Sequence, residues 1–131
     1  MESLSQRQTI LPLTESLGLA RDSVAALLGA AGVAQSVIDD AQLVVTELLS
    51  NAMRHAEPPL GLEVSVADSG VVIEVADHSP ELLPQQLPPD LARTGGWGMG
   101  ILTAISSAWG VRTFPDHKVV WALLPATWAI P

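Results

Sequence analysis

The spacing of apolar residues changes once along this chain, on either side of Pro58-Pro59, and this change limits the folds that the chain can adopt. Before the two prolines, apolar residues recur at the spacing of one face of an α-helix. After them, Leu62, Val64 and Val66 alternate with polar or small residues, as in a β-strand with one buried face. The chain is therefore expected to combine helices and a sheet in an α+β fold.

The N-terminal part predicts a strand followed by a helix. Gln8–Pro12 is a candidate for a short edge strand, because proline is tolerated at the end of such a strand. A helix is expected over about Glu15–Ala31, with Thr14 or Ser16 as its N-cap and Gly32 as its stop.

A second helix is expected from Ser36, as its N-cap, to His55. Asp39 and Asp40 then fall in its first turn, where the helix dipole favours negative charge. Its apolar positions form a broad face that we expect to be buried: Val44, Val45, Leu48, Leu49, Ala52 and Met53.

Beyond Pro59, turn residues divide the chain into further elements. Asp68-Ser69-Gly70 is typical of a hairpin turn between two strands. The elements expected after this turn are a strand at Val71–Ala76, a loop from Asp77 to Thr94, a helix from the glycine cluster to about Trp109, and strands at Val111–Phe114 and Val119–Leu124. The order β-α-α-β-β-loop-α-β-β predicts a two-layer sandwich with helices packed on one face of a mixed β-sheet. We expect a single domain over residues 1–131, with its core at about residues 8–125.

Charge and composition exclude several classes of protein. With 6 Lys and Arg against 14 Asp and Glu, the net charge is -8, which argues against direct binding of nucleic acid. There is no cysteine for a disulfide, a thiolate nucleophile or a zinc site. We find neither a leader of the secretory type nor an apolar stretch of membrane-spanning length. The expectation is a cytoplasmic protein that does not bind membranes.

Three clusters have residue types suited to chemistry, and the first lies on the second predicted helix. Glu47, Asn51 and His55 follow one another at intervals of four, so they form a polar row on one helix face. An amide oxygen suits Mg²⁺, and a carboxylate can deprotonate an attacking hydroxyl. On spacing alone, such a row is more often the solvent-exposed face of an amphipathic helix.

The second cluster is Asp77-His78-Ser79-Pro80, directly after a predicted strand. A buried carboxylate at a strand end can accept a hydrogen bond from an exocyclic amine. The same residues are also common in a simple turn, where the aspartate caps the loop.

The third cluster is the glycine-rich segment Gly95-Gly96-Trp97-Gly98-Met99-Gly100, which opens a predicted helix. Glycines allow close approach of the backbone, and free amide groups at a helix start attract phosphate. Neither a Rossmann fingerprint nor a P-loop fits, because the preceding segment is a proline-rich loop and no Gly-Lys-Ser/Thr follows. A hinge without a ligand is the alternative.

In this order, the three clusters resemble those of the GHKL (Bergerat-fold) ATPases, and in particular the small anti-sigma factor serine/threonine kinases and their stand-alone actinobacterial-type relatives. The resemblance covers nearly the whole chain, from about Leu11 to Leu124. The segments that support it are Ala20–Val24, Glu47–His55, Asp77–Pro80, Gly95–Leu102, Ala108–Val111 and Lys118–Trp121.

The resemblance assigns a role to each matching residue. It implies ATP and Mg²⁺ as cofactors, with Asn51 as the metal ligand, Glu47 as the general base and Asp77 as the reader of the adenine amino group. It places His55 near the nucleotide and implies that the phosphates are held by the backbone of a lid segment: Gly96, Gly98, Met99 and Gly100. Arg21 matches a first-helix arginine that contacts protein partners. Two departures are the absence of glycines after Asp77 and Trp97 in place of an arginine.

The implied partners are a sigma factor and an anti-anti-sigma antagonist of the STAS type, and a homodimer is expected because relatives of this kind commonly dimerise. The leading hypothesis is an ATP-dependent protein kinase that sequesters the sigma factor and phosphorylates the antagonist. The alternatives are a nucleotide-sensing or purely protein-binding anti-sigma module without phosphotransfer, and a plain α+β interaction domain.

Overall fold

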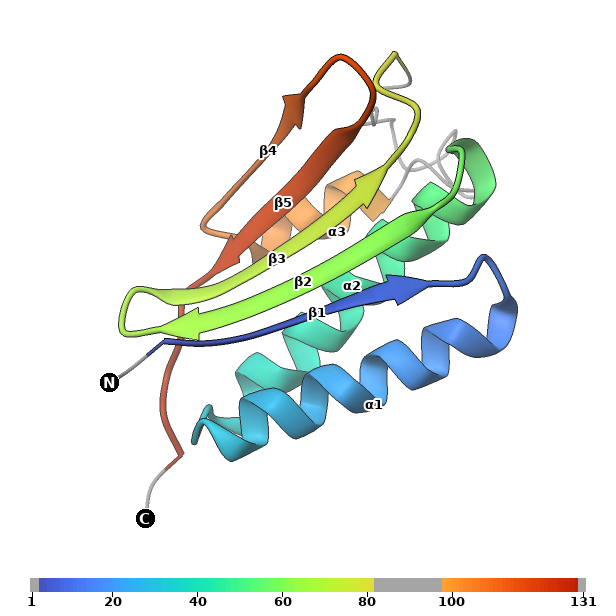
Figure 1. The fold of residues 1–131 in the computed structure, drawn as a ribbon. Helices are drawn as coiled ribbons and strands as arrows, with labels where there is room; N and C mark the ends of the chain where they lie inside the picture. Colours follow the sequence, from blue (N-terminus) through green and yellow to red (C-terminus); the bar gives the residue numbers. More distant parts are fainter. Residues whose placement is uncertain (1–2, 82–97, 130–131) are drawn as a thin grey trace.

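The computed structural model describes residues 3–81 and 98–129. The elements in chain order are β1 (Leu4–Ile10), α1 (Thr14–Ala30), α2 (Gln35–His55), β2 (Leu60–Ala67), β3 (Gly70–Asp77), α3 (Gly98–Ile105), β4 (Ala108–Thr113) and β5 (Lys118–Leu124). This order is the predicted one, and Figure 1 shows the helices gathered behind a twisted sheet. In the described part of the chain, no helix is long and apolar enough to cross a membrane.

The sheet has five strands in the order β1-β2-β3-β5-β4. Each of the four pairings found among the described residues is antiparallel, so the prediction of a mixed sheet is wrong in this detail. The connection through α3 makes β3 and β4 run in the same direction, as a crossover helix should. The two strands are not neighbours, however, because β5 lies between them and pairs with both.

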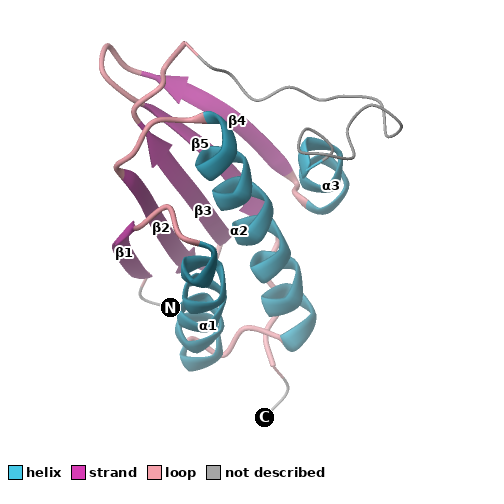
Figure 2. Cartoon of the chain, turned by 90° about the vertical axis from the view of Figure 1, so that its right-hand side faces the viewer, coloured by secondary structure: helices cyan, strands magenta, loops and turns pink. Residues whose placement is uncertain are grey.

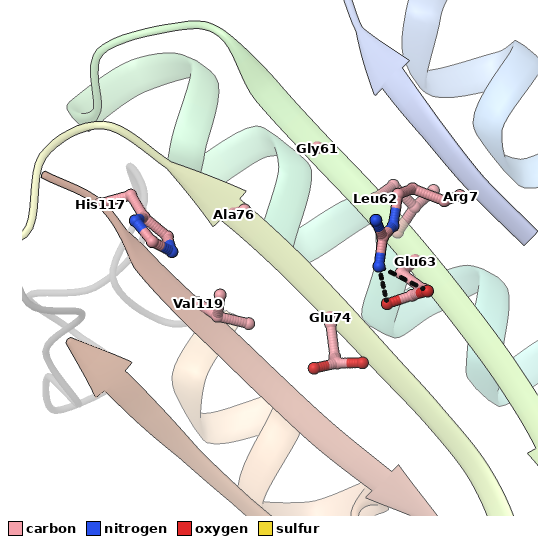
Figure 3. A pocket seen from close by; sticks show the side chains of 8 residues that line it. All are labelled: Arg7, Gly61, Leu62, Glu63, Glu74, Ala76, His117 and Val119. Carbon is pink, nitrogen blue, oxygen red and sulfur yellow. Dashed lines mark hydrogen bonds and ion pairs between the residues drawn. The ribbon is translucent and has the colours of Figure 1, made fainter. Parts of the chain in front are cut away.

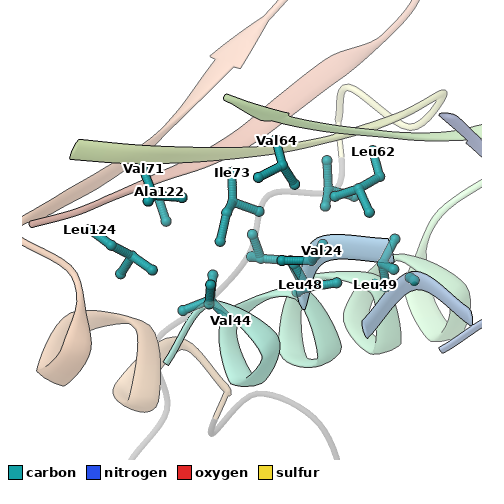
Figure 4. Packing of buried hydrophobic residues seen from close by; sticks show 14 of the residues in the cluster. Val24, Val44, Leu48, Leu49, Leu62, Val64, Val71, Ile73, Ala122 and Leu124 are labelled. Atoms are coloured by element: carbon teal, nitrogen blue, oxygen red, sulfur yellow. The ribbon is translucent and has the colours of Figure 1, made fainter. Parts of the chain in front are cut away.

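The helices cover one face of the sheet and leave the opposite face open (Figure 2). The core lies between the two layers, where the inward-pointing side chains of β2, β3 and β5 meet α1 and α2 (Figure 4). Side chains with almost no exposed surface form its centre: Val24, Leu28, Val44, Leu49, Leu62, Val64, Ile73 and Leu124. Each stabilises the fold by about 1.5–3 kcal/mol relative to an exposed position.

The helix starts differ from the predicted ones. α1 follows Leu13 and α2 follows Ala34, both in extended backbone, and neither residue provides a side-chain cap. Ser36 lies inside α2, and the first turn of α2 holds no acidic residue. The start of α2 is fixed instead by the C-terminal segment, since the amide of Ala34 donates to the carbonyl of Thr127 at 2.8 Å. The expected serine cap is absent, and the residue before the helix is bonded to a segment distant in sequence.

Two glycine turns are confirmed. Gly32 ends α1 with φ of +82°, a conformation that favours glycine. Gly70 opens β3 with φ of +134°, and a Cβ there would lie 2.4 Å from the Leu124 carbonyl oxygen. The hairpin between β2 and β3 therefore requires glycine at this position.

The third helix is shorter than predicted. It ends at Ile105, whereas Trp109 lies in β4. The amide of Ser107 donates to the carbonyl of Leu123 at 2.9 Å, so the backbone joins the sheet directly after the helix. Trp109 still faces α3, because its indole nitrogen donates to Thr103 at 3.0 Å. The spacing of apolar residues alone does not show whether Trp109 ends α3 or belongs to β4.

Candidate functional site

The polar row on α2 is less exposed than an ordinary solvent face. Glu47 and Asn51 are half-buried, whereas His55, the last residue of the helix, is exposed. Leu48, Leu49 and Ala52 fill the buried face of the same helix. The reading of this row as a simple solvent face is therefore wrong for Glu47 and Asn51.

Asn51 has the most unusual environment in this row. Its Oδ1 atom is buried, and it has no hydrogen-bond partner among the described residues. An unsatisfied buried polar atom costs about 1–3 kcal/mol, so such an atom requires an explanation. A neutral amide oxygen is a good ligand for Mg²⁺. This oxygen therefore fits the metal ion that the resemblance implies.

Glu47 lies one helical turn before Asn51, on the same side of α2. Partial burial raises the pKa of the Glu47 carboxyl above its ordinary value, and the positive charge of Arg54 opposes this shift. A carboxylate with a raised pKa is a stronger base than an exposed one. The environment of Glu47 is therefore suited to accepting a proton.

Asp77 ends β3 and is buried, with 2% of its surface exposed. Its Oδ1 accepts a hydrogen bond from the Lys118 ammonium group at 2.8 Å and another from the amide of Ser79 at 2.8 Å. Lys118 also donates to the carbonyl of Ser79 at 2.8 Å. Asp77 and Lys118 are direct partners in the register of β3 and β5. The reading of Asp77 as the cap of a turn is thus partly right, but the carboxylate also forms a buried ion pair.

The same cluster is connected to the end of α2. The hydroxyl of Ser79 accepts a hydrogen bond from the amide of Glu57 at 2.8 Å, and the amide of His78 donates to the carbonyl of Glu57 at 3.0 Å. These bonds hold the end of β3 beside the segment that follows His55. Figure 1 shows the C-terminal end of α2, the end of β3 and the start of β5 at one end of the molecule.

The glycine cluster is described only in part. Gly98, Met99 and Gly100 form the first turn of α3, which contacts α2 and sends Leu102 into the core. A Cβ at Gly100 would meet no atom within 4 Å. Gly96 and Trp97, with residues 82–94 of the predicted loop, lie outside the described residues.

Arg21 lies at the interface between α1 and α2. Its guanidinium donates to the hydroxyl of Thr46 at 3.3 Å, and its carbonyl accepts from the side chain of Gln42 at 3.1 Å. The side chain is half-buried, so it is held on the helical layer next to the residue that precedes Glu47.

Sequence reasoning missed Lys118 as a member of this site. The alternation along β5 indicated that its side chain is buried. Lys118 lies an even number of positions before three residues that all face the helices: Val120, Ala122 and Leu124. A lysine on the buried side of a strand requires a partner of opposite charge. The partner itself depends on the register between β3 and β5, which the alternation does not specify.

A separate hollow of about 330 Å³ lies on the open face of the sheet (Figure 3). Its floor includes Gly61 and Ala76, and its rim includes Glu63, Glu74 and His117. Arg7 pairs with Glu63 at 3.2 Å across the rim. The hollow faces away from α2, so it is not part of the site formed by Glu47 and Asn51.

Comparisons with known proteins concern the fold and the family of this chain. The crystal structure of the RsbU and RsbW domains of Rv1364c from Mycobacterium tuberculosis matches 98% of this chain with a TM-score of 0.71 and 15% identity, a likeness that concerns the fold. The chain spans 35% of the length of that structure. No curated protein matches the sequence. The family model described as a histidine kinase-like ATPase domain matches residues 10–123, and the chain therefore belongs to the histidine kinase-like ATPase domain family.

Proposed function

We propose that this chain binds ATP together with Mg²⁺ and acts as a regulatory serine/threonine protein kinase that phosphorylates an anti-anti-sigma antagonist and sequesters a sigma factor. The observation that carries the proposal is the buried Oδ1 of Asn51, which has no partner among the described residues. It lies one helical turn from a carboxylate whose pKa is raised by burial. Membership of an ATPase-domain family supports a nucleotide as the ligand.

The chemistry of each residue type suggests its role in the proposed site. Asn51 holds Mg²⁺, which neutralises charge on the nucleotide phosphates when it is bound. Asp77 accepts a hydrogen bond from the adenine amino group, and His55 lies near the nucleotide. The backbone of Gly98, Met99 and Gly100 approaches the phosphates at the start of α3, where free amides favour anions. The resemblance adds Gly96 to the residues proposed to hold the phosphates.

In the transfer step, Glu47 accepts the proton of a serine or threonine hydroxyl on the antagonist. The hydroxyl oxygen forms a bond to the γ-phosphorus, the bond to the bridging oxygen breaks, and ADP leaves. Positioning and charge neutralisation supply most of the catalysis in such reactions. The half-buried position of Glu47 suits this role, because burial makes its carboxylate a stronger base.

Regulation would follow from the charge that the transfer adds. A phosphoryl group places about -1.5 to -2 charges on the antagonist, which disfavours an interface with an acidic protein. The net charge of this chain is -8. Release of the antagonist frees the kinase to bind the sigma factor, with Arg21 on the helical layer as a proposed contact.

A binding module without phosphotransfer is the second candidate, and two departures from the family pattern favour it. No glycine directly follows Asp77, and Trp97 stands where the resemblance leads us to expect an arginine. Incubation of the protein with ATP labelled in the γ-phosphate and with candidate antagonists separates the two functions. Label on an antagonist supports the kinase, and ATP binding without any transfer supports the module.

The first test is calorimetric titration with ATP, with and without Mg²⁺. We expect the change Asn51→Ala to weaken Mg²⁺-dependent binding roughly tenfold or more, because a ligand to the metal is lost. The neighbouring change Ser50→Ala, at another half-buried position of α2, is the matched control and should leave binding unchanged. Equal affinities of the wild type and the Asn51 variant would remove Asn51 from the metal site.

A further inference from the structure

The ammonium group of Lys118 is buried on the helix-facing side of the sheet. Its side chain is 4% exposed, and the Asp77 side chain with which it pairs is 3% exposed. Removing two charges from water costs several kcal/mol for each ion, so a buried pair is weak evidence for a role in stability. Apolar residues occupy the equivalent inward positions of β5 at Val120, Ala122 and Leu124. The pair therefore requires an explanation other than packing.

The hydrogen bonds of the pair are unevenly distributed over the carboxylate. Oδ1 of Asp77 accepts from both the Lys118 ammonium and the Ser79 amide, each at 2.8 Å. In the described part of the chain, no hydrogen bond to Oδ2 is found. The Ser79 hydroxyl is bonded to the amide of Glu57, so the segment that holds Oδ1 is itself fixed. The carboxylate is thus held through one oxygen.

We propose that Lys118 is a positioning residue for base recognition: by holding Oδ1 of Asp77, it leaves Oδ2 as the acceptor for the exocyclic amine of an aminopurine nucleotide. This inference rests on the proposed function, since it concerns the base of the nucleotide proposed above. The Lys118 ammonium group and the Ser79 amide both donate to Oδ1, so the oxygen that remains for a ligand is a hydrogen-bond acceptor. The pair thereby favours a base that carries an amino group over one that carries hydrogen or a carbonyl oxygen at the same position.

The surroundings contain few other charges that could replace Lys118 in this role. His78, the next residue in the chain, is exposed and its Nδ1 lies 3.0 Å from the carbonyl of Pro59. His117, the residue before Lys118, has its Nδ1 2.7 Å from Asp116. Glu57 is exposed and contacts the cluster through its backbone. Among the described residues, Lys118 is the cation that touches the Asp77 carboxylate.

The test compares two nucleotides that differ at one group, ATP and the triphosphate of purine riboside, which has hydrogen in place of the amino group. Their dissociation constants are measured with Mg²⁺ by calorimetry. For the wild type we expect ATP to bind roughly 10- to 100-fold more tightly, the range for a hydrogen bond to a charged group. Lys118→Gln should reduce this ratio to within about threefold, and Lys118→Arg, which keeps the charge, should retain most of it.

A variant that keeps Lys118 tests the orientation directly, and its ammonium group retains the carbonyl of Ser79 as a hydrogen-bond partner. In Asp77→Asn, the lysine is expected to hold the amide oxygen, so that the amide NH₂ takes the place of Oδ2. The preference should then shift from ATP towards inosine triphosphate, whose carbonyl oxygen accepts from that NH₂. The double variant Asp77→Asn and Lys118→Gln should show a smaller shift, because the ammonium group is lost and the Ser79 amide is the remaining donor that selects the orientation of the amide.

The outcomes separate this inference from the function on which it rests. If Lys118→Gln weakens both nucleotides equally and leaves their ratio at the wild-type value, the lysine has a structural role and the inference is wrong. An Asp77→Asn variant that keeps the wild-type preference for ATP also overturns it. If the folded wild-type protein binds neither nucleotide, the proposed ATP site fails and the inference fails with it.

Discussion

The two faces of the sheet carry ion pairs in different environments. On the helix-facing side, Asp77 and Lys118 pair with side chains that are 3% and 4% exposed. On the open side, Arg7 and Glu63 pair with side chains that are 78% and 29% exposed. The open side also holds a pair between Glu74 and Arg112. Because water screens the open pairs, they add little to stability, whereas the loss of one partner from the buried pair leaves a charge that is almost completely removed from water.

The largest effect that we expect comes from removing the buried cation. Lys118→Met keeps much of the side-chain volume but leaves Asp77 unpaired, which should lower the free energy of unfolding by about 3–5 kcal/mol. Urea denaturation measures this change. The double variant Lys118→Met and Asp77→Leu removes both charges and should recover a large part of the loss. A single variant as stable as the wild type would show that the pair is not effectively buried.

A smaller difference in stability should distinguish the two faces of the sheet at apolar positions of β3. Val75 points into the core and is 1% exposed, whereas Val72 lies on the open face and is half-buried. Val75→Ala removes two buried methyl groups and should cost about 2 kcal/mol, and Val72→Ala should cost less than about 1 kcal/mol. Thermal or urea unfolding of both variants measures the difference. Equal losses would mean that the open face is covered in solution.

The raised pKa of the half-buried Glu47 carboxyl can be tested through the pH dependence of stability. Burial raises the pKa of Glu47 in the folded protein, with Arg54 opposing the shift. The folded state therefore binds the proton more tightly than the unfolded state, and this group lowers stability as the pH rises from its ordinary pKa through the raised value. Glu47→Gln should increase the melting temperature near pH 7 and change it little at a pH well below the ordinary pKa. A variant that is stabilised equally at both values would contradict the raised pKa.

The smallest expected effect is on the open face. Arg7→Ala removes the partner of Glu63, and the change in the free energy of unfolding should lie between 0 and about 1 kcal/mol. The remaining effect should shrink further in high salt, because mobile ions screen exposed charges. Urea unfolding at low and high salt measures both values. A loss comparable to that of Lys118→Met would remove the distinction between the two faces.

The elements of the fold were predicted well where the signal is local. The alternation of Leu62, Val64 and Val66 predicted which face of β2 is buried, and all three are in the core. The turn at Gly70 and the stop at Gly32 were also confirmed, because both depend on backbone conformations that favour glycine. The helix starts were not predicted correctly, because α2 follows Ala34, which provides no side-chain cap and whose amide bonds to the distant Thr127.

For the candidate site, the sequence predicted the position of three residues along one helix but not their burial. The intervals between Glu47, Asn51 and His55 place them along one side of a helix, and the structure has them on α2 as expected. Their burial was open from spacing alone, because both a solvent face and a ligand site have this period. The structure shows that Glu47 and Asn51 are half-buried and that the Oδ1 of Asn51 has no partner among the described residues.

The sequence by itself determined the order of helices and strands, the faces that they bury and the polar row of α2, because each depends on residues a few positions apart. Only the tertiary structure decided that Lys118 pairs with Asp77, from which it is separated by 41 positions. That pairing depends on the register of β5 against β3, and on the packing of α2 beneath them. A one-residue shift of β5 would turn Lys118 to the open face, so the whole core selects the partner of this single charge.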